Sequence, residues 1–365
     1  MSLKIRFSEK LNFSSKNSSK NRVGLDIGSS SLKAVELRLS GADDYELAAY
    51  GFEELAPEWV ADSVIVSPEP IADAINSIFM NQRIKNDEVV VAVSGHSAIV
   101  KKISLHAQNT EDFAETVRWE AEQHLPFDID DVNFDFQIIG ENLATGMVDV
   151  LFVAAKKDII QNYTNVLKLA RKTPKILDVN SFALLNAYEY NYEPDSDKTA
   201  ALLNIGANTM TINLTSGSDF LFTRDISVGG HRYTEFLQKE FNLDYDTAQA
   251  LKHGEAVGNV SAADMQYVVD AVTEILCMEI QKTFDFFKST STVKNIDRML
   301  VSGGAIHTPG LLAALGDNFD IPVEEFDSFK KIHINERLFP MIKKQAADMA
   351  IAVGLALRSE EVDIA

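Results

Sequence analysis

The feature that most constrains the fold is a strand–turn–strand motif that occurs twice, about half a chain apart. The first copy runs from Val23 to Leu37 as V-G-L-D-I-G-S-S-S-L-K-A-V-E-L, and the second from Leu202 to Leu214 as L-L-N-I-G-A-N-T-M-T-I-N-L. Alternating apolar residues predict a β-hairpin in each copy. The copies are offset by 178 residues, and we expect one residue fewer in the second turn. Such a repeat predicts two similar lobes.

The turn of the first copy carries groups that suit phosphate oxygens. It offers unobstructed backbone N–H groups, three hydroxyls and a lysine, supplied by Gly28, Ser29, Ser30, Ser31 and Lys33. Asp26 ends the first strand and faces the same turn. A carboxylate beside phosphate is repelled unless a divalent cation lies between them, so the pairing predicts Mg²⁺ held by Asp26 through water. Taken alone, Gly/Ser-rich turns also close ordinary hairpins.

The second turn repeats this plan with different side chains. Its predicted phosphate-binding residues are Asn204, Gly206, Ala207, Asn208 and Thr209, with Asn204 in the place of Asp26. A third element, Leu300 to Leu311, predicts a strand that ends at Gly303 and Gly304 before a helix begins. Backbone at such a Gly-Gly pair lies flat enough to contact a base or a ribose.

The two hairpins and the Gly303-Gly304 loop, in this order, resemble the actin-like ATPase superfamily over nearly the whole chain. The resemblance implies an α/β fold with two lobes, each a duplicated mixed sheet. It also implies ATP and Mg²⁺ as ligands, with the polyphosphate clamped from both sides.

Residues 98–171 predict a self-contained α+β subdomain inserted into the first lobe. Its pattern gives strands near 99–105, 132–139 and 148–154 and helices near 110–125 and 158–171. Within it, Trp119 to Phe136 reads W-E-A-E-Q-H-L-P-F-D-I-D-D-V-N-F-D-F and resembles the PilM family of type IV pilus assembly, which is related to the division protein FtsA.

The predicted domain boundaries follow from these elements. They are a basic arm at 1–22, a first actin-like lobe at 23–96 and 176–196, an insert at 97–175, a second lobe at 197–345, and a C-terminal helix at 346–358 that returns to the first lobe.

Two further segments resemble those that hold the ribose and base in FtsA-like proteins. One is S-V-G-G-H-R-Y-T-E-F-L at 227–237, with Gly229 and Gly230, and the other is T-A-Q-A-L-K at 247–252. The family usually has Glu where this chain has Gln249, whereas Lys252 matches the family.

The resemblance to PilM implies a function for the chain. It implies a cytoplasmic scaffold that captures the N-terminal tail of the inner-membrane protein PilN, in a groove beside the insert, and that works with other pilus assembly proteins in twitching motility. Asn204 replaces an aspartate that orients Mg²⁺ and the attacking water in the superfamily, so we expect weak or no ATPase activity.

Two other functions stay open. A filament-forming ATPase like FtsA lacks support because the chain ends in Glu360, Glu361 and Asp363 rather than in a basic amphipathic helix. A sugar-kinase-like transferase would need a sugar cleft and a catalytic base, for which the sequence offers no distinct signal.

Composition and charge restrict the partners. The formal net charge of −20 argues against nucleic acid as a natural partner. The first 22 residues differ, with six basic residues against one acidic one, and form either a solvated tail or a peripheral contact with anionic lipid. No apolar run reaches the roughly 18 to 20 residues that span a bilayer, so we expect a cytoplasmic protein. Self-association into homo-oligomers is left open.

Several side chains allow two interpretations. Asp178 and Glu189 either position water or have ordinary surface roles, the latter being favoured. Trp119 and Phe127 are candidates for the peptide groove, although aromatic residues beside a helix end are more often part of the core. The acidic cluster Asp128, Asp130, Asp131 and Asp135 lacks the glycine and closing glutamate of an EF-hand, which favours a solvated turn over a calcium site.

Overall fold

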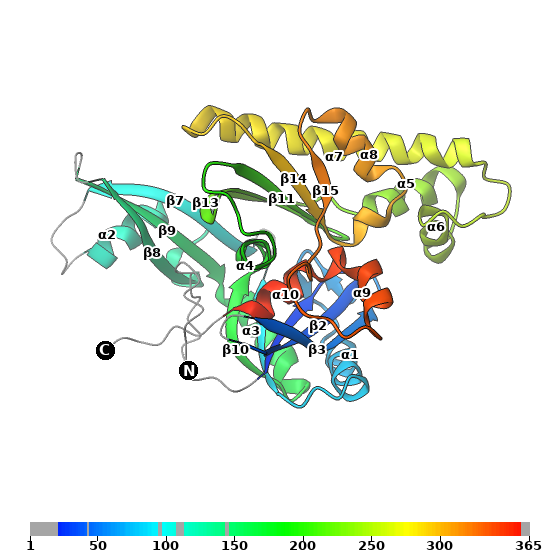
Figure 1. Cartoon of the computed structure of the whole chain (residues 1–365), viewed down its shortest axis with the longest axis horizontal. Helices are drawn as coiled ribbons and strands as arrows, with labels where there is room; N and C mark the ends of the chain where they lie inside the picture. The colour runs from blue at the N-terminus through cyan, green and yellow to red at the C-terminus, as the bar shows by residue number, and fades with distance from the viewer. Residues whose placement is uncertain (1–20, 42–43, 94–96, 107–112, 143–145, 359–365) are drawn as a thin grey trace. The chain divides into compact units, whose positions relative to one another are not determined.

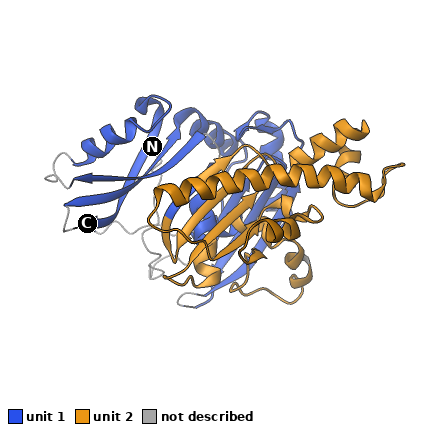
Figure 2. Cartoon of the chain, turned by 90° about the horizontal axis from the view of Figure 1, so that it is seen from above, with its two compact units in different colours: residues 1–186, 221–223, 351–365 blue, residues 187–220, 224–350 orange. Residues whose placement is uncertain are grey.

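The structure, a computed structural model, describes residues 21–41, 44–93, 97–106, 113–142 and 146–358. The basic arm up to residue 20, residues 94–96 at the predicted end of the first lobe segment, and the acidic C-terminal residues lie outside this range. The chain divides into two compact units, residues 1–186, 221–223 and 351–365 and residues 187–220 and 224–350 (Figure 2).

The first unit contains a five-stranded mixed sheet (Figure 1). Its strands, in spatial order, are β10 (Thr173–Val179), β6 (Glu88–Val93), β1 (Arg22–Ile27), β2 (Ser31–Leu39) and β3 (Tyr45–Glu54). β1 pairs with β2 in antiparallel and with β6 in parallel orientation. The continuous apolar run of β6 is buried, as expected for a parallel strand whose two faces are covered.

The second unit repeats this sheet. Its strands, in the equivalent order, are β15 (Val323–Glu325), β14 (Arg298–Ser302), β11 (Thr199–Ile205), β12 (Met210–Ser216) and β13 (Asp219–Ile226). β11 is antiparallel to β12 and parallel to β14, as β1 is to β2 and β6. The duplication predicted from the two hairpins is confirmed in the topology of both sheets.

The register corrects the predicted length of the second turn. Ile27 pairs with Leu32 in the first hairpin, and Ile205 pairs with Met210 in the second. Each turn therefore has four residues between its last paired positions, and the offset of 178 holds on both sides. The expectation of one residue fewer was wrong because it relied on apolar alternation, which does not mark the last strand pair.

The insert follows β6 and forms its own three-stranded antiparallel sheet. The order is β7 (Ala98–His106), β9 (Met147–Lys156) and β8 (Val132–Asn142), with α2 (Phe113–Glu122) on one face and a 3₁₀ turn η2 (Ile129–Asp131) before β8. Val117 and Ala121 of α2 are fully buried against Phe152 and its neighbours in a small core. The insert thus has a hydrophobic core of its own.

Helix α3 (Lys157–Leu169), which the sequence places in the insert, contacts α1 (Pro68–Asn81) and β10 of the first sheet. Asn162 on α3 accepts from the backbone N–H of Ile65 and donates to its carbonyl, both at 2.9 Å. Ile65 belongs to a short hairpin of β4 (Val60–Ala61) and β5 (Val64–Ile65). Helix α3 therefore joins the insert to the elements of the first sheet.

The C-terminal helix α10 (Ala350–Leu357) lies in the first unit from Ile351 onward. The 3₁₀ turn before it, η4 (Ala347–Met349), belongs to the second unit. A Cβ at Gly354 would overlap the carbonyl of Ala183, and a Cβ at Gly24 would overlap that of Ala352. Glycine is required at both positions because backbones meet there.

The remaining helices of the described ranges belong to the second unit, except α4, which spans the boundary between the units. They are α4 (Asn180–Tyr192), α5 (His231–Phe241), α6 (Tyr245–Lys252), α7 (Ala262–Thr290), η3 (Gly304–His307), α8 (Leu311–Asn318) and α9 (Phe339–Gln345). The division between the units falls inside α4, between Asn186 and Ala187, rather than in the loop after it. The first turn of the long helix α7 is capped by the Ser261 side chain.

Candidate functional site

The first turn is closed by a backbone hydrogen bond and bordered by an ion pair. The N–H of Gly28 donates to the carbonyl of Ser31 at 3.0 Å. Asp26 and Lys33 are cross-strand neighbours, and Lys33 Nζ lies 3.3 Å from Asp26 Oδ2. Both side chains are only 11 to 12% exposed. The turn therefore combines one cation and one anion in a partly desolvated place, where charge–charge interactions are stronger than in bulk water.

The second turn has the same closure and a different border. The N–H of Gly206 donates to the carbonyl of Thr209 at 2.9 Å. Asn204 stands opposite Thr211 rather than opposite a lysine. The Ser302 hydroxyl donates to the Leu203 carbonyl at 2.9 Å and lies 3.2 Å from Asn204 Oδ1. The side chains of Asn204, Thr211 and Ser302 at this border are thus uncharged, and the nearby carboxylate of Asp225 accepts from Thr211.

The Gly229-Gly230 loop is hydrogen-bonded to the second turn. The N–H groups of Gly230 and His231 donate to the carbonyls of Gly206 and Ala207, each at 2.8 Å. A Cβ at Gly229 would overlap the Gly206 oxygen and lie 2.6 Å from that of Ala207. These two N–H groups therefore hold the turn in place.

The Gly303-Gly304 loop approaches the same turn from β14. Gly303 has φ +90°, and a Cβ there would lie 2.5 Å from the Ile205 carbonyl oxygen and 2.9 Å from Asn204 Oδ1. Its N–H donates to the Ala347 carbonyl at 2.9 Å. Only glycine accommodates both this backbone conformation and this approach.

Lys252 and Gln249 lie together on α6. Lys252 is 6% exposed, and its Nζ donates to Gln249 Oε1 and, at 3.3 Å, to the Thr234 hydroxyl. The Thr234 hydroxyl also donates to Gln249 Oε1 at 2.7 Å. Burial lowers the pKa of Lys252 to about 8, because desolvation disfavours the ammonium form.

A second titratable pair borders the Gly303-Gly304 loop. His307 Nε2 lies 3.0 and 3.1 Å from the two carboxylate oxygens of Asp348. The hydrogen bond from the imidazole to Asp348 raises the pKa of His307. Asp348 lies in η4, next to Ala347, whose carbonyl accepts from Gly303. The His307–Asp348 pair and the backbone hydrogen bond from Gly303 to Ala347 therefore attach η4 to the segment after β14 at two points.

The structure brings the predicted residues together in two groups. Asp26, Gly28 and Lys33 meet at the first turn, in the first unit. The second group lies in the second unit, where the turn residues contact the two glycine pairs: Asn204, Gly206, Ala207, Gly229, Gly230 and Gly303. Two residues that contact this hairpin, His231 and Ser302, lie in segments that the sequence singled out but were not named there as site residues. Tyr245 and Thr234 join the group indirectly, through hydrogen bonds to His231 and to Gln249.

Two predicted surface or core assignments are corrected. Asp178 is fully buried, not a surface residue, and Arg358 Nε lies 3.3 Å from its carboxylate. Burial raises the pKa of Asp178, and Arg358 opposes the shift. Trp119 is 63% exposed on α2, so the core assignment was wrong for this residue. Phe127 is half-buried, and Lys156 lies over its ring.

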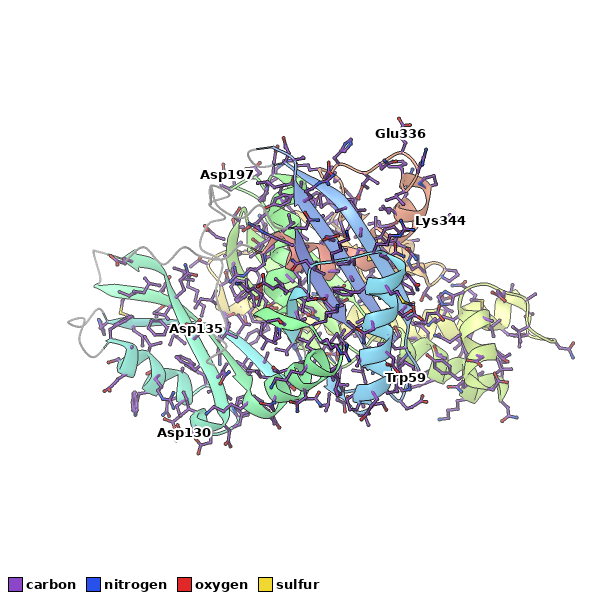
Figure 3. All side chains as sticks on the ribbon, turned by 90° about the horizontal axis from the view of Figure 1, so that it is seen from below. Trp59, Asp130, Asp135, Asp197, Glu336 and Lys344 are labelled. Carbon is purple, nitrogen blue, oxygen red and sulfur yellow. The ribbon has the colours of Figure 1, made fainter. Side chains whose placement is uncertain are left out.

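The acidic cluster of the insert is dispersed. Asp130 pairs with Arg118 at 2.6 Å, whereas Asp135 lies in β8 opposite Val153, and the two side chains lie apart (Figure 3). Glu189 is half-buried on α4. In the described ranges, no group of three or more His, Cys, Asp or Glu residues could hold a metal ion.

Known proteins resemble this chain in sequence and in fold. The sequence model of the type IV pilus assembly protein PilM matches residues 24–360. A solved structure described as the PilM-PilN type IV pilus biogenesis complex is 25% identical, with a TM-score of 0.83 over 93% of this chain and 99% of that chain.

Two more distant structures show the fold alone. The ethanolamine utilization protein EutJ from Carboxydothermus hydrogenoformans is 12% identical, with a TM-score of 0.56 over 94% of this chain and 91% of that chain. MreB5 of Spiroplasma citri bound to ADP is 13% identical, with a TM-score of 0.51 over 92% and 95%. The chain therefore has the two-lobed actin-like ATPase fold and belongs to the PilM family of type IV pilus assembly proteins.

Proposed function

We propose that this protein is a nucleotide-controlled scaffold of type IV pilus assembly, which binds ATP with Mg²⁺ and captures the N-terminal tail of a PilN-type inner-membrane protein. The observation that carries the nucleotide half is the pair of glycine-closed turns, built alike in both units. Family membership and the similarity to a PilM-PilN complex support the partner half.

The residues of the first turn fit a nucleotide polyphosphate. At Gly28 a Cβ would lie 3.0 Å from the Ser31 carbonyl oxygen and 3.6 Å from Lys33 Nζ, so glycine keeps the approach to the turn open. Lys33 is the cation for a phosphate, and Ser29 to Ser31 add hydroxyl and N–H donors. In the second turn, the segment from Gly206 to Thr209 would contribute backbone donors.

Asp26 fits Mg²⁺ as an oxygen ligand acting through water. The part of the chain that the structure describes has no cluster of three such ligands, so the ion would be held mainly by phosphate oxygens and water. Mg²⁺ is commonly bound in this way, with one or two carboxylates. The ion would reduce repulsion between the nucleotide and the Asp26 carboxylate.

We infer that turnover is slow or absent. Asn204 is neutral and faces the Ser302 hydroxyl, so it supplies neither the charge nor the proton acceptor that a carboxylate would bring. We expect less than about one turnover per second, a rate below those typical of committed enzymes. A steady-state phosphate-release assay with Mg²⁺ tests this, and a faster wild-type rate would contradict it. Asn204→Asp measures what the missing carboxylate contributes.

The proposed place of partner capture is a groove beside the inserted subdomain, residues 97–175, in which Trp119 is exposed. An acidic chain with a net charge of −20 attracts basic residues in a tail next to a membrane span. Because the proposed partner is an inner-membrane protein, we place the chain at the cytoplasmic face of that membrane, with at most peripheral lipid contact. Within the described ranges, none of the helices combines the length and apolar character needed to cross a bilayer.

The test is the affinity for a synthetic PilN-type N-terminal peptide, with and without Mg-ATP. Asp26→Ala and Lys33→Ala remove the first turn's charges, and Arg38→Ala is a matched control on the same strand, because Arg38 is exposed and pairs with Glu46. We expect affinity to change with nucleotide in the wild type and the control, and not in the two turn variants.

Trp119 fluorescence, isolated by Trp59→Phe, reports whether the peptide reaches the insert. Nucleotide binding without peptide binding under any condition would overturn the pilus scaffold. If the affinity for the peptide does not change with nucleotide, only the proposed control by nucleotide is overturned.

A further inference from the structure

A continuous chain of side chains connects the second turn to the buried lysine. Asn208 Oδ1 lies 2.6 Å from His231 Nδ1, and His231 Nε2 lies 3.1 Å from the Tyr245 hydroxyl. That hydroxyl accepts from Gln249 Nε2 at 3.1 Å, and Gln249 Oε1 accepts from Lys252. We call these five residues the Asn208–Lys252 chain. It runs through α5 and α6 of one unit.

The donor and acceptor groups at the two ends of this chain decide which atom donates in each of its hydrogen bonds. Lys252 has only donors, so Gln249 must present its oxygen to Lys252 and its NH₂ group to Tyr245. At the other end the amide oxygen of Asn208 only accepts, so the proton of a neutral imidazole lies on Nδ1 of His231. The bare Nε2 then accepts from the Tyr245 hydroxyl. Every bond in the chain thus donates from Lys252 toward Asn208.

The surroundings of His231 favour the neutral imidazole that this direction requires. Burial lowers the pKa of His231, and the positive charge of Lys252 on α6 adds to the effect, while Glu235 on its own helix opposes it. The ring of Tyr245 stands edge-on to the imidazole, at 5.9 Å between centroids and 82° between planes, which fixes its orientation. A charged imidazole would have to donate from both nitrogens.

The geometry points to Asn208 as a contact for a ligand phosphate and to His231 and Tyr245 as its positioning residues. With Oδ1 held by His231, the Nδ2 group of Asn208 is the part of the amide left to donate to an anion. This inference rests on the proposed nucleotide function and names a donor in the second turn beyond its backbone. The equivalent residue in the first turn is Ser30, whose carbonyl accepts from the backbone N–H of Leu55.

The experiment measures two quantities separately, the protonated nitrogen of the His231 imidazole and the affinity for ligand. ¹⁵N chemical shifts of the His231 side chain in the full-length protein report which nitrogen carries the proton. Affinity for Mg-ATP and for tripolyphosphate is measured for the wild type, Asn208→Ala, Tyr245→Phe and the double variant. Tyr267→Phe on α7, an exposed tyrosine, is the matched control.

We expect protonated Nδ1 in the wild type, a changed Nε2 shift in Tyr245→Phe, and about tenfold weaker binding of both ligands in Asn208→Ala. The double variant loses little more than Asn208→Ala, because both changes act through one amide. Additive losses, or a proton on Nε2, would overturn the positioning chain even when nucleotide binds. If the wild type binds neither ligand, the proposed nucleotide function falls, and the ligand contact of Asn208 falls with it.

Discussion

The two turns are closed by the same backbone hydrogen bond but differ in the charges at their borders. Each is closed by a glycine N–H that donates to the carbonyl three residues later. The first is bordered by the Asp26–Lys33 ion pair, whereas the second has Asn204 beside a serine hydroxyl and lies in contact with two glycine pairs. Duplication has thus kept the shape of the turn, while the charges at its border differ between the two units.

The largest expected difference is in the unfolding free energy lost when Gly303 or Gly28 is replaced by alanine. Gly303→Ala should cost about 3 kcal/mol of unfolding free energy, because it adds a strained φ to a backbone clash with Ile205. Gly28→Ala should cost about 1 kcal/mol, because its nearest neighbour is at 3.0 Å. Urea unfolding measures both.

The control for both glycine variants is Gly316→Ala. Gly316 lies in α8, and no heavy atom comes within 4 Å of the position that a Cβ would take there, so the helix should gain about 0.5 kcal/mol. Equal losses at Gly303 and Gly28 would show that the second turn is no more tightly enclosed than the first.

Exchanging the border residues tests the electrostatic difference. Asp26→Asn leaves Lys33 without its carboxylate in a mostly buried place, and we expect a loss of about 2 kcal/mol. Asn204→Asp places a carboxylate opposite Thr211 without a cross-strand lysine, at a cost of about 1 kcal/mol at pH 7.

The Asn204→Asp loss should shrink on acidification. Desolvation without a cross-strand lysine is expected to raise the folded-state pKa of the introduced carboxylate. The folded state of the variant would then bind more protons than the unfolded state above pH 4, and its stability would fall as pH rises. Unfolding at pH 4 and pH 7 checks the sign. A loss independent of pH would mean that the amide's shape, and not its lack of charge, matters.

Burial of Lys252 should make folding stability depend on pH in the alkaline range. Its folded pKa of about 8 is depressed below the unfolded value, so from pH 8 to about 10 the unfolded state binds more protons and stability rises with pH. Relative to Lys252→Met, the wild type should gain on the order of 1 kcal/mol across this window. Parallel pH profiles of the two proteins would contradict the depressed pKa.

The smallest expected effect is the difference in pKa between His307 and His231, two histidines of the second unit. NMR titration should place His307 above the usual pKa near 6.5 and His231 below it. The His307–Asp348 contribution is present below pH 6.5 and is lost as pH rises through the folded pKa of His307. Because His307 is 39% exposed, its removal by His307→Gln should change stability only slightly. Titration of both histidines at the same pH would contradict the assignment.

The hairpins, the glycine pairs and the insert were predictable because their signals are local. Alternating apolar residues predict strands, and glycines mark positions where backbone must turn or approach another group. The exact turn length was not predictable, since apolar Ile27 and Met210 do not show which residues pair last. The burial of Asp178 was missed because its partner, Arg358, lies far along the chain.

The sequence by itself determined the duplicated architecture and the glycine that begins each turn, because the strand pattern, the turn glycine and the repeat offset can all be read from local stretches of sequence. Only the tertiary structure decided which side chains border the turns. Ser302 and His231 reach the second hairpin from two separate segments, Tyr245 supports His231 from a third, and Lys33 meets Asp26 through strand register. Hydrogen bonds and ion pairs act over a few ångströms, so their partners are set by packing and not by separation along the chain.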